Sequence, residues 1–303
     1  MSFLYWLESL RIPLITEIML LITHLGEETA FLVAAIIVFW CVSKKRGYYL
    51  MAIGFIGTIA NQFLKMLFRV PRPWVLDENF TAVEGAKAEA TGFSFPSGHT
   101  QNSVGTFGAL GYTAQHRWSR IACIVIAILV PFSRMYLGVH TPQDVIVSVV
   151  VALALVLLLH PVIYGAGRKR MYVLLGTMLS VCVGYLLFVH LYPFPADVDP
   201  ERLESGIVNG YTLLGSIVGM LIAYIVDEKW LHFPVKAKWW AQFLKVVIGL
   251  AIVLAVKSGL KAPLNMLMGE YVGRAVRYFL VVVVAGILWP MTFKWFSKLG
   301  SKE

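Results

Sequence analysis

Residues 143–163 read QDVIVSVVVALALVLLLHPVI, an apolar run long enough to cross a bilayer as one helix. Comparable runs fall near 27–43, 48–68, 98–115, 120–138, 171–192, 207–226, 243–260 and 275–293. Of the 303 residues 58% are hydrophobic and 14% are charged, whereas a soluble domain averages about 45–50% and roughly 25%. This composition excludes a water-soluble globular protein. We predict an all-α integral membrane protein with about nine transmembrane helices plus an N-terminal interfacial helix, formed by the amphipathic segment 1–26.

Basic and acidic residues alternate between the apolar runs, and this alternation predicts the orientation of the chain. Because loops rich in lysine and arginine stay in the cytoplasm, the basic connections are predicted to be cytoplasmic and the acidic ones to face outside. The net charge of +9 is spread over separate loops, so we expect no nucleic-acid partner. Basic residues gather at 44–46, 117–120, 168–170, 229–238 and in the C-terminal tail, and acidic residues gather at 77–89 and 197–204.

The connection between the last two runs departs from this rule. Lys257, Lys261, Arg274 and Arg277 outweigh Glu270 there, on the predicted outer side. One hypothesis is that Arg274 and Arg277 contact the headgroup of an anionic substrate or of another anionic lipid. The alternative is that these long side chains only extend to the membrane interface.

Three groups of polar residues stand at the predicted outer ends of the runs, where an ordinary membrane helix has none. Arg134 lies about 20 Å along its helix from Arg120 at roughly 1.5 Å per residue, and a charge at that depth is costly unless it is paired or functional. A proline, a serine and a glycine before His99 mark a helix start whose free amides can bind an anion. The groups are Lys65 with Arg72, then Pro96-Ser97-Gly98-His99, then Arg134 with His140 and Asp144.

Together these side chains are suited to cleaving a phosphate ester. Three cations and one carboxylate leave about two positive charges, which can balance a phosphate dianion. If a helix begins near Thr141, the four-residue spacing brings the Asp144 carboxylate within reach of the His140 imidazole. Asp144 can then hold the Nδ1 proton of His140 so that Nε2 attacks phosphorus, while His99 protonates the leaving oxygen. The cations take the role that metals play in other phosphoryl transfers, so no metal or other cofactor is expected.

The same residues resemble the three-part signature of the type 2 phosphatidic acid phosphatase superfamily, over roughly 27–163. That resemblance implies metal-independent hydrolysis through a phosphohistidine on His140, with Asp144 as its orienting carboxylate. It implies that His99 is the general acid in the first step and the base for water in the second. It also implies a phosphate-binding set made of Lys65, Arg72, Ser97, Gly98 and Arg134.

The layout is similar to that of sphingosine-1-phosphate phosphatases and glucose-6-phosphatases within this superfamily. We expect a lipid phosphate monoester as substrate and the lipid bilayer as partner, because an active site near the membrane surface suits a tethered headgroup. A soluble sugar phosphate and a polyprenyl pyrophosphate remain alternatives, since a fold does not decide among them. The site is expected on the non-cytoplasmic side of a bacterial plasma membrane, or of the endoplasmic reticulum if the host is eukaryotic.

The chain is accordingly divided into an N-terminal interfacial helix over 1–26, a catalytic five-helix core over 27–163 and a C-terminal four-helix membrane region over 164–303. Two other classes of protein stay open at this point. A lipid or phosphate-ester transporter would also carry charges within the membrane. A metallohydrolase would use His99, His140 and Asp144 as metal ligands.

Overall fold

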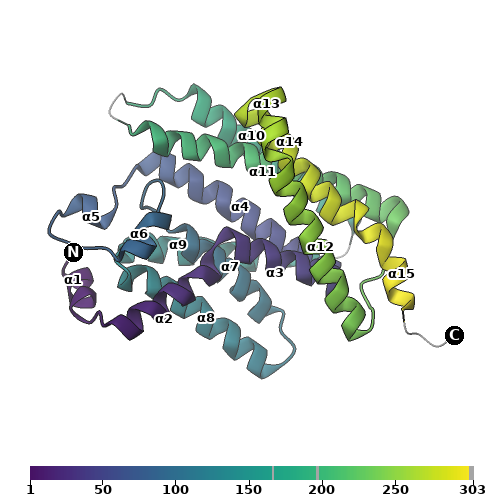
Figure 1. Cartoon of the computed structure of the whole chain (residues 1–303), viewed down its shortest axis with the longest axis horizontal. Coiled ribbons are helices and arrows are strands. Elements are labelled where there is room, and N and C mark those ends of the chain that lie inside the picture. The colour runs from purple at the N-terminus through teal and green to yellow at the C-terminus, as the bar shows by residue number, and fades with distance from the viewer. Residues whose placement is uncertain (166, 196–197, 300–303) are drawn as a thin grey trace. The chain divides into compact units, whose positions relative to one another are not determined.

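The computed structural model describes residues 1–165, 167–195 and 198–299, and every regular element within them is a helix (Figure 1). This confirms the predicted fold class. Asp197 of the second acidic loop and the tail residues 300–303 lie outside the described residues. The α-helices are α1 (Ser2–Ser9), α2 (Pro13–Thr23), α3 (Glu28–Cys41), α4 (Lys44–Phe68), α5 (Pro73–Leu76), α6 (Glu84–Glu89), α7 (Gly98–Tyr112), α8 (Arg117–Tyr136), α9 (Pro142–Tyr164), α10 (Arg168–Leu191), α11 (Pro200–Val226), α12 (Trp239–Gly259), α13 (Lys261–Met268), α14 (Glu270–Val283) and α15 (Phe293–Lys298). Four shorter helical segments are η1 (His24–Gly26), η2 (Asp227–Leu231), η3 (Val284–Leu288) and η4 (Pro290–Thr292).

Seven helical segments of the described chain are long and apolar enough to cross a membrane, as expected of an integral multi-pass membrane protein. The predicted count of about nine is not reached. The runs at 27–43 and 98–115 fold as α3 and α7, which have 14 and 15 residues. At 1.5 Å per residue these helices are about 21–23 Å long, short of the roughly 30 Å hydrocarbon core. The seven segments are Lys44–Leu76, Arg117–Tyr136, Pro142–Tyr164, Arg168–Leu191, Pro200–Leu231, Trp239–Met268 and Glu270–Lys298.

The N-terminal segment folds as two helices where a single interfacial helix was expected. The chain bends by 119° between α1 and α2. Pro13 begins α2, and Ile12 before it is extended, with φ −123° and ψ 149°, because a residue that precedes proline is disfavoured in the helical region. Both helices pack against α8 (Figure 1). Counted as one broken span, the pair raises the number of candidate spans among the described residues to eight.

The chain forms two compact units that each combine separate parts of the sequence. The residues predicted to do chemistry all belong to unit 1, whereas Arg274 and Arg277 belong to unit 2. The predicted boundaries at 26/27 and 163/164 follow the order of the chain and stay a prediction. Unit 1 contains Met1–Leu32, Tyr49–Pro161 and Pro193–Gly206, and unit 2 contains Val33–Tyr48, Val162–Tyr192 and Ile207–Glu303.

Glycines allow α4 and α7 to approach closely inside unit 1. A Cβ on Gly57 of α4 would lie 2.6 Å from the side chain of Gln101, and a Cβ on Gly105 of α7 would lie 2.8 Å from that of Ile53. Small residues are typical of such close helix pairs in membranes. Lys65 follows Gly57 by about two turns on α4, so this contact brings its side chain towards the start of α7.

Unit 2 uses glycines in the same way between α11 and α14. A Cβ on Gly215 would lie 2.0 Å from the carbonyl oxygen of Ala275, and one on Gly219 would lie 2.8 Å from the side chain of Val282. No larger residue fits at either position without moving the backbone of α14. The two helices therefore pack with their backbones in close contact.

Candidate active site

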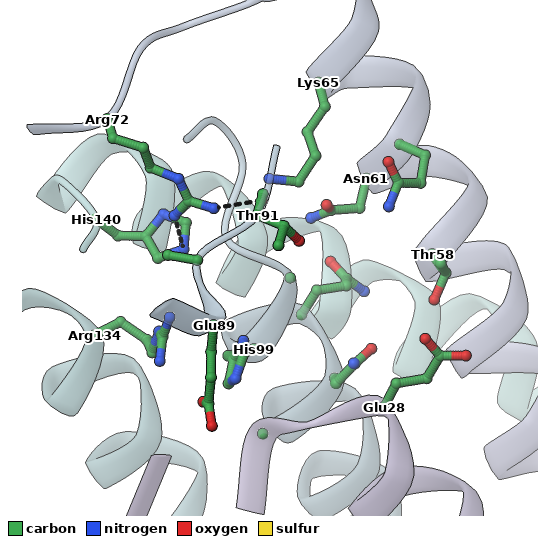
Figure 2. A pocket seen from close by; sticks show the side chains of 16 residues that line it. Glu28, Thr58, Asn61, Lys65, Arg72, Glu89, Thr91, His99, Arg134 and His140 are labelled. Carbon is green, nitrogen blue, oxygen red and sulfur yellow. Dashed lines mark hydrogen bonds between the residues drawn. The ribbon is translucent and has the colours of Figure 1, made fainter. Parts of the chain in front are cut away.

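A cavity of about 190 Å³ lies in unit 1, and polar side chains from α3, α4, α6, α7, α8 and three loops converge on it (Figure 2). Two of the eight predicted residues, Ser97 and Asp144, lie behind the cavity wall and are fully buried. The six that line the cavity are Lys65, Arg72, Gly98, His99, Arg134 and His140. The structure therefore brings together side chains that are far apart in the sequence.

The turn after α8 sets the position of His140 relative to Arg134. The amide of Gly138 donates to the carbonyl of Met135 at 3.0 Å, and the amide of Val139 donates to the carbonyl of Arg134 at 3.1 Å. These two bonds form a Schellman motif, in which the residue after the helix adopts the left-handed conformation and is usually glycine. Gly138 has φ +79°. Arg134 in the last turn of α8 and His140 just after the motif consequently reach the same cavity.

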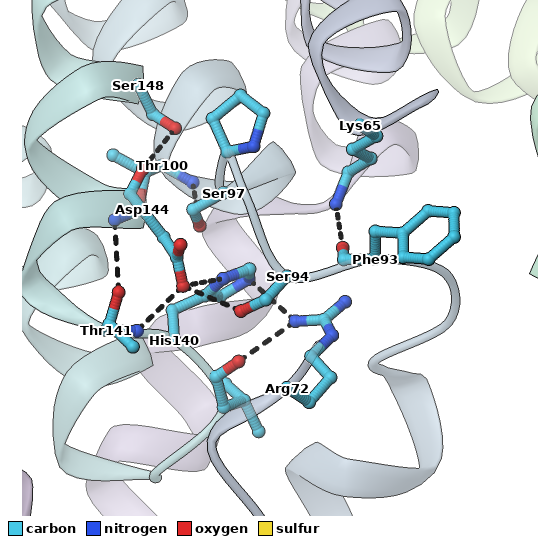
Figure 3. Close-up of polar contacts among 12 residues, drawn as sticks. Lys65, Arg72, Phe93, Ser94, Ser97, Thr100, His140, Thr141, Asp144 and Ser148 are labelled. Carbon is cyan, nitrogen blue, oxygen red and sulfur yellow. Dashed lines mark hydrogen bonds and ion pairs between the residues drawn. The ribbon is translucent and has the colours of Figure 1, made fainter. Parts of the chain in front are cut away.

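A capping box at the start of α9 holds Asp144 (Figure 3). The amide of Thr141 donates to Asp144 Oδ2 at 2.8 Å, and the amide of Asp144 donates to Thr141 Oγ1 at 3.3 Å. Pro142 occupies the first helical position, which suits a residue without an amide proton. Ser94 adds a further hydrogen bond from its hydroxyl to Asp144 Oδ2 at 2.6 Å. The carboxylate is thus held by three donors from two segments once His140 is included.

His140 lies between this carboxylate and the guanidinium of Arg72. Its Nδ1 lies 3.4 Å from Asp144 Oδ2, and its Nε2 lies 3.0 Å from Arg72 Nη1. Because a guanidinium only donates hydrogen bonds, Nε2 is the acceptor and Nδ1 carries the proton of the neutral ring. Burial, with Arg72, Arg134 and Lys65 nearby, holds the pKa of His140 well below its usual value. The imidazole is therefore neutral at neutral pH, with its lone pair on Nε2.

Arg72 is fixed by three backbone carbonyls in addition to His140. Its guanidinium donates to Val139 at 2.9 Å and to Thr91 at 2.9 Å, and its Nε donates to Gly92 at 3.3 Å. The side chain is only 4% exposed. The cation that is nearest to the reactive nitrogen is consequently held in place before any substrate arrives.

The other two cations are also buried, and each can donate more hydrogen bonds than it makes. The ammonium of Lys65 donates to the carbonyl of Phe93. Arg134 is 1% exposed, and its Nη1 donates to the hydroxyl of Thr23 at 2.7 Å. Its Nε has no hydrogen-bond partner among the described residues. Buried cationic donors without acceptors are suited to binding an anion.

The first turn of α7 presents Gly98 and His99 to the cavity. The hydroxyl of Ser97 caps this helix by accepting a hydrogen bond from the Thr100 amide at 3.4 Å. Ser97 therefore supports the helix start and is not part of the cavity wall. The Nε2 atom of His99 is buried and has no hydrogen-bond partner in the described part of the chain, so that it is available for proton transfer.

Two carboxylates that the sequence analysis did not place in the site, Glu28 and Glu89, also line the cavity. In the view of Figure 2, Glu89 lies between Arg134 and His99. Glu89 ends the short helix α6, in a loop that the sequence identified only as acidic. The net positive charge around the cavity is therefore smaller than a count of the three cations and Asp144 alone would give.

Three supporting residues were missed as well. Asn61 precedes Lys65 by four residues on α4 and donates to the carbonyl of Pro96 at 3.4 Å, and this helical spacing could have indicated it. Ser94 lies just before the Pro96 motif, but nothing local shows that it would reach Asp144. Thr23 has no sequence signal, because its contact with Arg134 spans more than a hundred residues.

The geometry does not favour the metallohydrolase interpretation. Among the described residues, the group of side chains whose ligand atoms converge does not include His99, His140 and Asp144. Asp144 is instead taken up by hydrogen-bond donors. The converging group, with ligand atoms within 4.8 Å of one another, is His24, Glu27 and Glu89.

Arg274 and Arg277, the predicted contacts to a substrate headgroup, are not among the residues that line this cavity. Both lie on α14 in unit 2. Arg277 is buried and Arg274 is half-buried.

Two family models match the chain. The model described as PAP2 superfamily matches residues 45–168, which contain all eight residues predicted for catalysis and phosphate binding. The model described as PAP2 superfamily phosphatase, transmembrane extension, matches residues 211–302.

Several curated proteins are similar to this chain. It is 30% identical over 226 residues to a probable sphingosine-1-phosphate phosphatase of Dictyostelium discoideum, across 69% of this chain and 52% of that protein. It is 29% identical over 150 residues to phosphatidylglycerophosphatase B of Bacillus subtilis (strain 168), across 45% and 70%. It is 28% identical over 137 residues to an undecaprenyl-diphosphatase of Sulfolobus acidocaldarius, across 45% and 65%. The chain thus spans about half of the Dictyostelium protein. No solved structure matches it.

Proposed function

Because this chain belongs to the PAP2 superfamily, we propose that it is a metal-independent membrane phosphatase that hydrolyses a lipid phosphate monoester. The names of its relatives support this proposal, since all three act on a phosphorylated lipid by those names. The single observation that carries it is the orientation of His140, with Nδ1 towards Asp144 and Nε2 towards the cationic cavity.

In the first step the phosphate occupies the cavity, where Lys65, Arg72 and Arg134 neutralise its oxygens. The Nε2 lone pair of His140 attacks phosphorus, and the bond from phosphorus to the ester oxygen breaks. Asp144 accepts the hydrogen bond from Nδ1 and stabilises the positive charge that the ring gains. Burial and the neighbouring cations hold the pKa of His99 far below its usual value in the free protein, so its protonated form depends on the negative charge of the bound phosphate. The protonated His99 then gives its proton to the departing oxygen, which leaves as an alcohol.

In the second step water hydrolyses the phosphohistidine. His99, now neutral, removes a proton from the water as its oxygen attacks phosphorus, and the bond between phosphorus and Nε2 of His140 breaks. Inorganic phosphate is released, and both rings return to their starting protonation states. The three cations stabilise charge on the phosphoryl oxygens in both steps, which is the contribution that metal ions make elsewhere.

The proposed substrate is a monoester such as sphingosine-1-phosphate or phosphatidate, reached from the non-cytoplasmic face. We infer the membrane side from the acidic loop 77–89, which supplies the cavity residue Glu89 and is predicted to lie outside. A polyprenyl diphosphate is the second candidate, because similar proteins in Sulfolobus acidocaldarius and Bacillus subtilis are named undecaprenyl-diphosphatases.

The proposal is tested by phosphate release from purified protein in lipid nanodiscs with excess EDTA. The substrates are sphingosine-1-phosphate, phosphatidate, undecaprenyl diphosphate and glucose-6-phosphate. We expect the two lipid monoesters to be preferred, orthovanadate to inhibit, and His140→Ala to lose about 10³-fold or more of kcat. His116→Ala, at an exposed histidine before α8, is the matched control and should keep full activity.

Three results would each contradict a different part of the proposal. Full activity of His140→Ala would exclude the phosphohistidine route. A loss of wild-type activity in EDTA that zinc restores would exclude metal independence. Preference for undecaprenyl diphosphate or for glucose-6-phosphate would leave the mechanism in place and replace the substrate class.

A further inference from the structure

Unit 2 contains a second concentration of positive charge, here named the basic cluster and made of Lys257, Arg274 and Arg277. The three cations surround one aromatic ring, that of Tyr278. The distances to the ring centroid are 5.9 Å for the Lys257 ammonium, 5.8 Å for the Arg274 guanidinium and 5.4 Å for the Arg277 guanidinium. Lys257 lies in the last turn of α12, and the two arginines lie one turn apart on α14.

Arg277 is the buried member of the basic cluster. It is 4% exposed, and its Nε has no hydrogen-bond partner among the described residues. None of the ion pairs found in the described chain involves the basic cluster. A cation within a membrane protein is costly unless an anion or a polar network accompanies it. Three cations without a carboxylate partner therefore indicate that an anion belongs here.

Contacts between α11 and α14 hold the basic cluster in place. Arg274 Nε donates to the hydroxyl of Thr212 on α11 at 2.7 Å. The same two helices make the close backbone contact at Gly215 and Ala275 described above. The positions of the arginines are consequently set by helix packing, as in a preformed binding site.

The surface that adjoins the basic cluster along the chain is apolar. Helix α13, which connects α12 to α14 and packs on α14, exposes three large side chains: Met266 at 85%, Leu267 at 74% and Met268 at 48%. Tyr211 and Tyr271 stack nearby on α11 and α14, with ring centroids 5.2 Å apart. Exposed apolar residues with tyrosines beside them are typical of the membrane interface. A ligand bound here would therefore contact the acyl chains of surrounding lipids as well as the three cations.

We propose that the basic cluster binds the phosphate of an anionic phospholipid headgroup, with the acyl chains lying along α13 and the adjoining surface. The guanidinium groups of Arg274 and Arg277 can each give two hydrogen bonds to phosphate oxygens, and Lys257 adds a point charge. This proposal goes beyond the phosphatase activity and does not depend on it, because no residue of the basic cluster lines the catalytic cavity.

The test measures the thermal stability of the purified full-length protein in neutral detergent mixed with phosphatidylcholine or with phosphatidylglycerol. We expect phosphatidylglycerol to raise Tm by several degrees in the wild type, because a ligand that binds the folded state stabilises it. Arg277→Met should not respond. Without anionic lipid this variant should be at least as stable as the wild type, since the substitution removes a buried charge that lacks a partner. Native mass spectrometry should show retention of phosphatidylglycerol weakened about tenfold.

Lys261→Gln is the matched control, because it removes one positive charge from an exposed position on α13. It should respond to phosphatidylglycerol as the wild type does. A response of Arg277→Met equal to that of the wild type would overturn the proposal, as would an equal loss of stability in both lipids. An equal rise in Tm with inorganic phosphate alone would show a site for free anions and would also overturn it. If Arg277→Met does not fold, the same Tm response is measured with Arg274→Gln in its place.

Discussion

The two ring nitrogens of His140 have different partners, and this difference organises the site at the scale of single residues. Asp144 faces Nδ1 and Arg72 faces Nε2. The contact with Asp144 holds the proton on Nδ1, and the contact with Arg72 keeps Nε2 unprotonated. Each contact favours the same tautomer, with the proton on Nδ1 and the lone pair on Nε2. Both contacts depend on neighbours that are themselves held by backbone hydrogen bonds.

The lowered pKa of His140 leads to a prediction about pH. In the proposed mechanism the neutral ring is the nucleophile, and a group with a lowered pKa stays neutral as the pH falls below the usual histidine value of about 6.5. The acidic limb of kcat/KM, which reports the free enzyme, should therefore lie lower in the wild type than in Arg72→Gln. That variant removes both the nearest positive charge and the donor to Nε2. Ionisation of the substrate affects both proteins equally, so it does not cause a difference between them. Identical acidic limbs of kcat/KM in the two proteins would contradict the assignment of this limb to His140.

Glu89 gives a second prediction at this scale, because its carboxylate lies at the phosphate cavity close to Arg134. An anion that enters must share the cations with this carboxylate. Glu89→Gln should therefore tighten inhibition by orthovanadate about three- to tenfold. Glu84→Gln, an exposed acid on the same helix α6 that does not line the cavity, should leave inhibition unchanged. Weaker inhibition of Glu89→Gln would instead show that the carboxylate helps to hold the anion.

At the scale of elements, the ends of two helices build the reactive side of the cavity. The Schellman motif that ends α8 and the capping box that begins α9 are separated by a single residue, His140. Local hydrogen bonds thus determine the path of the chain from Arg134 through His140 to Asp144. The opposite wall has another origin, because it depends on the close approach of α4 and α7 at Gly57 and Gly105.

Gly138 is the residue of this segment that tolerates substitution least. It has φ +79°, and a Cβ there would lie 2.6 Å from the Arg11 guanidinium and 3.0 Å from the Phe80 ring. Gly138→Ala should lower the free energy of unfolding by about 1–3 kcal/mol and reduce kcat by displacing His140. Gly269→Ala is the control, since Gly269 has φ +77° and nothing within 4 Å. Thermal unfolding and phosphate release should show a larger effect at 138 than at 269.

At the scale of the whole molecule, the two family matches correspond in part to the two compact units. Every catalytic candidate belongs to unit 1 and to the match over 45–168, whereas α12, α13 and α14 belong to unit 2 and to the match over 211–302. The cavity and the basic cluster are therefore built by different units. Each can be altered without changing a residue of the other.

The charge pattern predicts the side of the membrane on which each loop lies. We expect a membrane-impermeant thiol reagent to label Lys87→Cys in intact right-side-out vesicles, and to label Lys169→Cys only after permeabilisation. Cys41, Cys123 and Cys182 are free and are first replaced by alanine. Labelling of both positions from the same side would show that the loop 77–89 and the loop 168–170 share a face. The proposed non-cytoplasmic site would then be wrong.

Local sequence patterns predicted much of the site. They act over a few neighbouring residues, so they could not predict contacts between distant segments. The start of α9 at Pro142 follows from Thr141, Pro142 and Asp144 within four residues, so its geometry could be anticipated from spacing. Ser94 and Glu89 reach the site only because the segment between α5 and α7 folds back towards α4 and α9. The count of about nine helices is not confirmed, because the apolar runs at 27–43 and 98–115 fold as helices of only 14 and 15 residues.

By itself, the sequence determined an all-helical membrane protein and the three polar segments of its candidate active site, because apolar run length and helix-end chemistry act over a few neighbouring residues. Tertiary structure alone decided that Ser97 stays behind the cavity wall, that Glu89 enters the cavity, and that Arg277 is buried among cations on α14. These outcomes depend on which helix faces meet. That choice is made by packing between segments that lie far apart along the chain.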